Sequence, residues 1–223
     1  MLNRTRLSLA VLIVGIILSV PVQSQGGPGG GGLVPYLQSL PLEALSSQET
    51  TLILQMRQEE KLARDLYLQL AQTWSLPIFA NIANAEQQHM NFMAFLVTRY
   101  GLVDPVANDP AGVFQDPTFQ QVYDVLLLVG QVSPAHALLV GNIIEDVDIR
   151  DLNAGLTVAD NRDLRAVLQN LNKGSRNHER AFYPQLQALG WQYTPIFLDL
   201  PTLLAIVQGP IETGVYDENG NPI

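Results

Sequence analysis

The chain has 223 residues, of which 47% are hydrophobic and 7% aromatic, and its formal net charge is −9. This length suits one domain with tails, and the composition suits an aliphatic helical core. The 21 acidic residues outnumber the 12 basic ones and no basic stripe is visible, so we expect no nucleic-acid partner. The chain has no cysteine, which excludes disulfides, thiolate zinc sites and cysteine nucleophiles.

Residues 1–24 are typical of an export signal. Arg4 and Arg6 precede an apolar run over 7–20, which is short for a membrane span. Small residues at 22–24 suit cleavage after Ser24, and an uncleaved membrane anchor is the alternative. We therefore expect an exported protein, periplasmic or extracellular, without stable membrane insertion after the signal is removed.

Residues 25–45 are expected to form a glycine-rich tether followed by an irregular arm, because the first eight are nearly all glycine and the rest include two prolines. The main domain is predicted to cover 46–208. The remaining residues, 209–223, are polar and rich in turn formers, so we expect a loose tail.

Two long helices open the main domain. Ser46 and Glu49 form a capping box, which predicts a helix from there to about Thr73. Pro77 suits the first position of a second helix, which ends before Gly101. The short turn between them predicts an antiparallel hairpin.

A second hairpin follows a long connection. Asp-Pro pairs mark residues 102–133 as loop, with a short helix over 117–129. Ser133 caps a third long helix that ends near Val158, and Asp160 is expected to cap a fourth that ends near Leu189. A further short apolar helix is predicted over 200–207. Since the connection is long enough to run the length of a bundle, the second and third helices can start at the same end.

Each long helix carries polar residues at mid-length, within its apolar stripe. Residues three apart lie on one helical face, so each pair points the same way. The positions lie about 14–26 Å from the starts of their helices, which brings them to one level. Burying them without partners costs several kcal/mol, and a metal ion would compensate. The residues are Glu60, Glu86 and His89, Glu145 and Asp148, and Ser175 and His178.

This pattern resembles the ferritin-like superfamily, the relatives of rubrerythrin and bacterioferritin, and more narrowly a ferritin-like domain family of undetermined function. The resemblance covers about 46–193. It rests on EEKLARDLY over 59–67, EQQHM over 86–90, IEDVDI over 144–149 and GSRNH over 174–178. It implies an all-α, ferritin-like four-helix bundle with a long crossover between the second and third helices.

The resemblance also implies a metal site. By matching positions, the ligands would be Glu60, Glu86, His89, Glu145 and His178. Tyr67 matches the companion tyrosine of the first-helix ligand, where it could hydrogen-bond a ligand carboxylate or simply stack in the core.

The sequence departs from the superfamily at Ser175, where the fourth helix usually has glutamate. Asp148 would supply the missing carboxylate, as an extra acid on the third helix does in rubrerythrin-like sites. The site can therefore hold one ion or two.

Oxygen and imidazole ligands suit iron or manganese, and also zinc. Iron or manganese implies chemistry with dioxygen or peroxide, or oxidation of ferrous iron, so the expected partners are metal ions and small oxidants. Zinc would favour a structural or hydrolytic role. The alternative is a non-catalytic metal-binding or interaction module with a degenerate site, and a homodimer remains open.

Single residues have competing interpretations. Glu60 could instead be solvated and paired with Arg64, four residues further along the helix. Glu179 could replace His178 on the inner face. Asp146 and His136 are expected at the surface.

Overall fold

The computed structural model describes residues 32–223, and over this range the chain is all-helical. The predicted export signal and most of the predicted tether lie outside the described residues. Within them, no helix combines the length and the apolarity that crossing a membrane requires. The helices are α1 (Leu33–Ser39), α2 (Ser47–Trp74), α3 (Pro77–Arg99), α4 (Pro117–Gly130), α5 (Pro134–Val158), α6 (Arg162–Ala188) and α7 (Leu200–Gln208).

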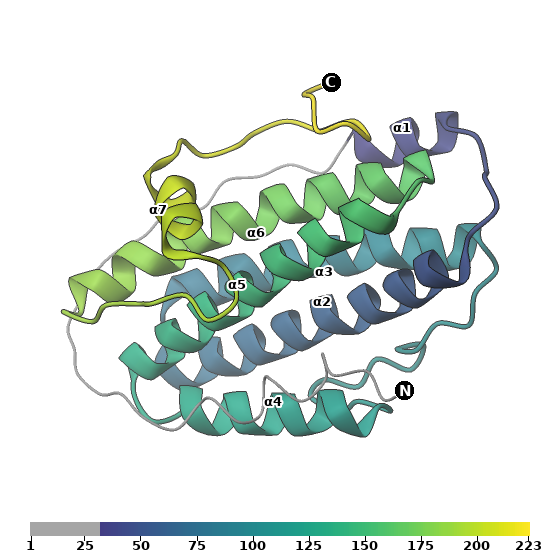
Figure 1. The fold of residues 1–223 in the computed structure, drawn as a ribbon. Helices are drawn as coiled ribbons and strands as arrows, with labels where there is room; N and C mark the ends of the chain where they lie inside the picture. The colour runs from purple at the N-terminus through teal and green to yellow at the C-terminus, as the bar shows by residue number, and fades with distance from the viewer. Residues whose placement is uncertain (1–31) are drawn as a thin grey trace.

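Four long helices, α2, α3, α5 and α6, run side by side (Figure 1). The most extensive contacts are between α2 and α3 and between α5 and α6, and α2 also packs on α5 as α3 does on α6. The connection from α3 to α5 carries α4, which packs against α2 and α5. The short α7 covers α6.

The ends of the long helices follow the local sequence signals closely. The capping box at the start of α2 is complete, because Ser46 Oγ accepts from Glu49 N–H while Glu49 accepts from Ser46 N–H at 2.8 Å. Pro77 and Pro134 both occupy the first turns of their helices. These helices therefore begin and end within one or two residues of the predicted positions.

The start of α6 differs from the prediction. The N-cap is Asn161, not Asp160. The backbone N–H groups of Asp160 and Asn161 both donate to Glu49 Oε1, at 3.0 and 3.1 Å. Because this carboxylate holds the loop in place, the helix starts one residue later than the Asp160 cap predicted.

The apolar core is divided into two parts along the long helices. One part lies beside the α2–α3 turn and includes Leu66, Phe79 and Phe182. The other lies beside α1 and the α5–α6 turn and includes Met93 and Leu168. On each long helix, the polar residues at mid-length fall between these two parts. The fold therefore encloses a polar layer between two apolar ones.

The segment before α2 was predicted to be irregular, but its first part is helical. Leu33 and Leu37 are buried in the second part of the core, and α1 packs on α6. The prediction failed because the prolines at 35 and 41 were taken as breakers, although a helix accepts proline in its first turn.

The tail, predicted to be loose, is bound to α6. Glu212 forms ion pairs with Arg176 and Arg180, the latter at 2.8 Å. Further along, Asn170 Nδ2 donates to the carbonyl of Tyr216 at 2.7 Å. Because these partners lie on the outer face of α6, the inner stripe of that helix gave no sign of them.

Candidate metal centre

Five ionisable side chains from four helices converge in the polar layer. Two triads, one of Glu60, Glu86 and His89 and one of Glu86, Glu145 and His178, each bring three ligand atoms within 4.8 Å of one another. All five side chains are buried, the most exposed at 7%. We call these five residues the Glu86 cluster, because Glu86 belongs to both triads.

Glu86 stands between the two imidazoles. His89 Nδ1 lies 2.7 Å from Glu86 Oε2 and 3.0 Å from Glu60 Oε2. His178 Nδ1 lies 2.8 Å from Glu86 Oε1 and 3.3 Å from Glu145 Oε2. Each oxygen of Glu86 therefore faces a different histidine, and each histidine is completed by one further carboxylate.

A glycine makes room for this arrangement. A Cβ atom at Gly174 on α6 would lie 2.3 Å from His89 Nε2, far inside normal contact. The imidazole of His89 thus packs directly against the backbone of α6, and the rings of His89 and His178 are 5.5 Å apart. Gly174 sets how closely α3 and α6 approach at the level of the cluster.

Tyr67 combines both predicted roles. Its hydroxyl donates to Glu145 Oε1 at 2.6 Å, which orients that carboxylate. Its ring packs against Phe79 and Phe182, with centroids 6.1 and 5.3 Å away. The tyrosine therefore joins the apolar layer to the Glu86 cluster.

Two residues of the expected site lie outside both triads. Ser175 is buried, and its Oγ donates to the carbonyl of Leu171 at 3.3 Å. Asp148 is 4% exposed, and its side chain makes no hydrogen bond or ion pair with the residues that the structure describes. The alternative that Glu60 is solvated and paired with Arg64 is wrong, because Glu60 is 1% exposed and contacts His89.

Burial and charge act in opposite directions on the centre of the cluster. Burial favours the neutral carboxyl of Glu86, but the two imidazolium groups outweigh it and lower the pKa of Glu86 to about 2. Burial likewise opposes a charged His89, but Glu60 and Glu86 raise the pKa of His89 to about 9. Burial opposes a charged His178 too, yet Glu86 and Glu145 raise its pKa well above the ordinary value. Protonated histidines thus balance part of the negative charge.

Nearby positive charge is too small to keep the outer carboxyl groups ionised. Burial raises the pKa of Glu145 to about 7 despite the nearby His178, and burial also raises the pKa of Glu60. Burial, followed by repulsion from Glu60 and Glu145, raises the pKa of Asp148 well above its usual range. The polar layer therefore contains more acid than the chain itself neutralises.

The donor set fits a transition-metal ion. Glu86 Oε1 is buried and has no hydrogen-bond partner among the described residues, although His178 Nδ1 is only 2.8 Å away. The two atoms are close, but their geometry does not meet that of a hydrogen bond, so Glu86 Oε1 keeps the capacity to bind an ion. Carboxylate oxygen and imidazole nitrogen suit iron, manganese or zinc.

Two further acids lie on the same helices as the cluster, and sequence reasoning misjudged one of them. Asp146, expected at the surface, is fully buried and accepts from the Tyr193 hydroxyl at 2.7 Å and from backbone N–H groups at 196–198. The segment after α6 covers this face of α5, which a bare bundle would leave open. Glu179 is also fully buried, and neither of its oxygens has a hydrogen-bond partner among the described residues. It lies beside His178 in sequence without replacing it in the triad.

His136, also expected at the surface, is half-buried beside the Trp191 ring, with centroids 5.1 Å apart. The segment after α6 again provides the cover.

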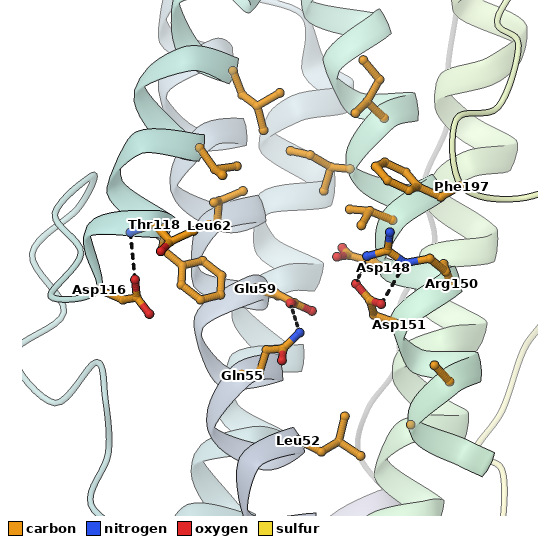
Figure 2. A pocket seen from close by; sticks show the side chains of 18 of the residues that line it. Leu52, Gln55, Glu59, Leu62, Asp116, Thr118, Asp148, Arg150, Asp151 and Phe197 are labelled. Atoms are coloured by element: carbon orange, nitrogen blue, oxygen red, sulfur yellow. Dashed lines mark hydrogen bonds and ion pairs between the residues drawn. The ribbon is translucent and has the colours of Figure 1, made fainter. Parts of the chain in front are cut away.

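A groove of about 340 Å³ runs between α2, α4 and α5. Figure 2 shows Glu59 on α2 facing Asp148 on α5 across it. Burial, followed by repulsion from Asp151, raises the pKa of Glu59 to about 8. Neither the groove nor Glu59 was identified from sequence, because Glu59 was taken only as the neighbour of Glu60. Asp148 therefore lines the groove, and the acids of the Glu86 cluster repel its ionised carboxyl.

Comparisons with known proteins give one family and one relative. A family model described as "Uncharacterized protein domain (DUF2202)" matches residues 49–210. The chain is 43% identical, over 183 residues, to "Uncharacterized protein MJ0754" of Methanocaldococcus jannaschii, covering 82% of this chain and 99% of that protein. The crystal structure of hypothetical protein MJ0754 superposes with a TM-score of 0.76 at 44% identity, covering 78% of this chain and 99% of the other. The matched region contains the whole Glu86 cluster.

Proposed function

The chain belongs to the family of the uncharacterized protein domain DUF2202, and on that premise we propose that it is a ferritin-like four-helix bundle that binds metal. The proposed site holds one or two iron or manganese ions, with zinc as a further candidate, in the Glu86 cluster. The proposed activity is redox chemistry with dioxygen or peroxide, or oxidation of ferrous iron. We also propose, from the export signal predicted in the sequence, that this activity lies outside the cytoplasm.

The central position of Glu86 is the observation that supports the proposal best. Its two oxygens face the Nδ1 atoms of two histidines that come from different helices. Each histidine has a further carboxylate, Glu60 or Glu145, on its other side. A shared carboxylate with one histidine and one outer carboxylate on each side supplies the ligands for two adjacent ions.

The residues of the chain have separate tasks in this proposal. Glu60, Glu86, His89, Glu145 and His178 would hold the metal. Iron or manganese, when bound, supplies the ability to exchange electrons with an oxidant. Tyr67 holds Glu145 in position through its 2.6 Å hydrogen bond, and the apolar layers on both sides exclude water. Both histidines must give up a proton to bind metal, so uptake should release protons.

A second candidate is metal binding without turnover. Ser175 supports it, because α6 offers no second carboxylate at this position and the serine hydroxyl donates to Leu171 instead. Asp148 belongs to neither triad, and its carboxyl would have to move to complete a ligand set. In this case the cluster would store or sense a metal ion, or stabilise the fold.

Elemental analysis of protein purified without chelator tests both candidates. We expect iron or manganese at one to two ions per chain, and an absorption change on aerobic loading with ferrous iron. The variant Glu86→Gln removes the shared charge and should lose metal at both positions. Asp124→Asn, which changes an exposed acid on α4, should bind as the parent protein does.

The outcomes separate the candidates. Bound metal with catalysed oxidation of ferrous iron supports the redox role, whereas bound metal without oxidation supports the second candidate. A chain that takes up none of iron, manganese and zinc contradicts both. Equal metal content in Glu86→Gln and the parent would place the metal elsewhere and would also contradict both.

A further inference from the structure

The groove between α2, α4 and α5 has the size of a small-molecule site. Its volume of about 340 Å³ lies at the lower end of the range for ligand pockets, roughly 300–1,000 Å³. Most of its wall is apolar, with Leu62 from α2, Phe119 and Leu126 from α4, and Val147 from α5. Phe197 closes one side (Figure 2). Such a wall suits the hydrocarbon part of an organic molecule.

The charged and titratable groups in the groove divide into a paired set and an unpaired set. Arg150 is paired with Asp151, its Nε donating at 2.8 Å, and its guanidinium also lies over the Phe197 ring at 4.4 Å. These two charges cancel. Glu59 Oε1 accepts from Gln55 at 2.7 Å, but its Oε2 is buried and has no hydrogen bond within the described chain. The second oxygen of Glu59 therefore has an unused capacity to accept a hydrogen bond.

Asp148 provides the second unpaired acid. The residue is 4% exposed and lines the groove, and its side chain makes neither a hydrogen bond nor an ion pair with any residue from 32 to 223. Figure 2 shows it on the wall opposite Glu59. A buried acid with an oxygen that accepts no hydrogen bond is costly to ionise, so two such acids across an apolar groove form a place where a cation would be stabilised strongly.

We propose that this groove binds a small organic cation, a primary amine or similar group on an apolar body, with its positive charge between Glu59 and Asp148. An ammonium group can donate three hydrogen bonds, which matches the free carboxylate oxygens on the two walls. The apolar walls cover the rest of the molecule. This site is separate from the Glu86 cluster, and its occupation requires no metal.

The geometry favours an organic cation over a bare metal ion. Among the described residues, the only groups that bring three acidic or histidine ligand atoms within 4.8 Å are the two triads that share Glu86. Glu59 and Asp148 belong to neither triad.

Calorimetric titration of the full chain with hexylamine tests the proposal, both after treatment with chelator and after loading with metal. Hexan-1-ol has nearly the same shape without the charge, and hexanoate reverses the charge. We expect saturable binding of one hexylamine per chain, and about tenfold or more weaker binding of the alcohol, because hydrogen bonds to charged groups are the strong ones. Hexanoate should not bind.

Three variants locate the binding. Asp148→Asn and Glu59→Gln keep shape while removing charge, and each should weaken hexylamine binding by about tenfold without changing the affinity for hexanol. Ala154→Trp adds bulk at an exposed position on the rim and should weaken both ligands. Asp124→Asn, on the outer side of α4, is the matched control and should bind hexylamine normally.

Several results would overturn the proposal. These are the absence of saturable hexylamine binding, equal binding of amine and alcohol, and unchanged binding in both Asp148→Asn and Glu59→Gln. Binding of Zn²⁺ or Mn²⁺ that depends on these two acids, without amine binding, would make the groove a metal site and would also overturn it. Because the chelator-treated protein is tested, failure of the metal proposal would leave this result unaffected.

Discussion

Two buried charge clusters contact α2, and they are built on opposite principles. The first, which we call the paired cluster, consists of Lys61, Arg64, Asp65 and Asp109. Its two cations balance its two acids, and it joins α2 to the crossover loop. The second is the Glu86 cluster on the inner side of α2, where only two histidines oppose three glutamates.

The difference extends to hydrogen bonding. In the paired cluster, Asp65 accepts from Lys61, from Arg64 Nε at 2.9 Å and from the Gly112 N–H at 2.9 Å. In the Glu86 cluster, by contrast, Glu86 Oε1 has no hydrogen-bond partner within the described chain. Buried charges whose hydrogen bonds are all formed stabilise one arrangement of the chain. Buried charges that lack hydrogen-bond partners destabilise the fold, and a bound ligand can offset that free energy. This difference supports a structural role for the paired cluster and agrees with the binding role proposed for the Glu86 cluster.

The largest expected effect comes from breaking the paired cluster. Asp65→Asn leaves Lys61 and Arg64 buried with too little negative charge, and should destabilise the fold by about 3–5 kcal/mol. Urea denaturation of the metal-free protein measures the change, and Asp124→Asn on the surface is the control. Metal content per folded chain should stay as in the parent protein. A loss below about 1 kcal/mol would mean that this cluster is not structural.

A smaller effect is expected where the backbone of α6 supports the Glu86 cluster. In Gly174→Ala the new Cβ would lie 2.3 Å from His89 Nε2, so the imidazole must shift. We expect about 1–3 kcal/mol of destabilisation and a loss of metal affinity of about tenfold or more. Ser175→Ala, at the next position, removes only a 3.3 Å bond to Leu171 and serves as the control. Equal metal affinity in both variants would show that Gly174 does not position His89.

Acid should reveal a third, smaller contribution at the start of α2. Glu49 is fully buried; although burial favours its neutral form, hydrogen bonds from Ser46 and from the Asn161 and Asp160 backbones lower its pKa below the usual 4.5. A carboxyl group whose pKa is lower in the folded state stabilises the fold at pH values above its pKa in the unfolded chain. That stabilisation is lost as the pH falls through the pKa of the folded state. Glu49→Gln should therefore cost about 1.5 kcal/mol at pH 7 and progressively less below pH 4.5.

Thermal unfolding from pH 7 down to pH 3 measures this difference, and it isolates Glu49 because all other carboxyl groups are common to both proteins. A gap between the variant and the parent that stays constant with pH would contradict the assignment.

The smallest effect should have the opposite sign. The side chain of Asp148 has no partner among the described residues, and Asp148→Asn removes a carboxyl group whose ionisation is opposed by burial and by neighbouring acids. We expect the metal-free protein to gain about 1 kcal/mol. If the variant instead loses stability as Asp65→Asn does, Asp148 belongs with the structural charges and the contrast between the two clusters fails for it.

Local signals predicted the long helices and the position of the cluster residues well. The capping box at Ser46 and the prolines at 77 and 134 mark helix starts directly. Spacing of three residues fixed which side chains share a face, so Glu86 and His89 were expected together. The distance of each residue from the start of its helix then predicted that all of them lie at the same height in the bundle. These features depend on short stretches of sequence, which explains why they could be predicted.

The features that were missed depend on segments packing from outside the long helices. Asp146 is buried because residues 191–198 cover it, and Glu212 binds α6 from a tail with no regular structure. The groove at Glu59 exists because α4 forms its third wall. None of these contacts leaves a periodic pattern in the sequence, since each joins positions more than 30 residues apart.

The pairing of Tyr36 on α1 with Glu218 near the end of the chain has a practical consequence. Glu218 also binds Arg162 at the start of α6, so both ends of the described chain share one anchor on the molecule (Figure 1). A protease cut between α7 and Glu212 would remove that anchor and loosen the first helix together with the last residues. For the same reason, joining residue 223 to residue 33 by a short linker and opening the chain in the α4–α5 loop should give a permuted protein that still folds.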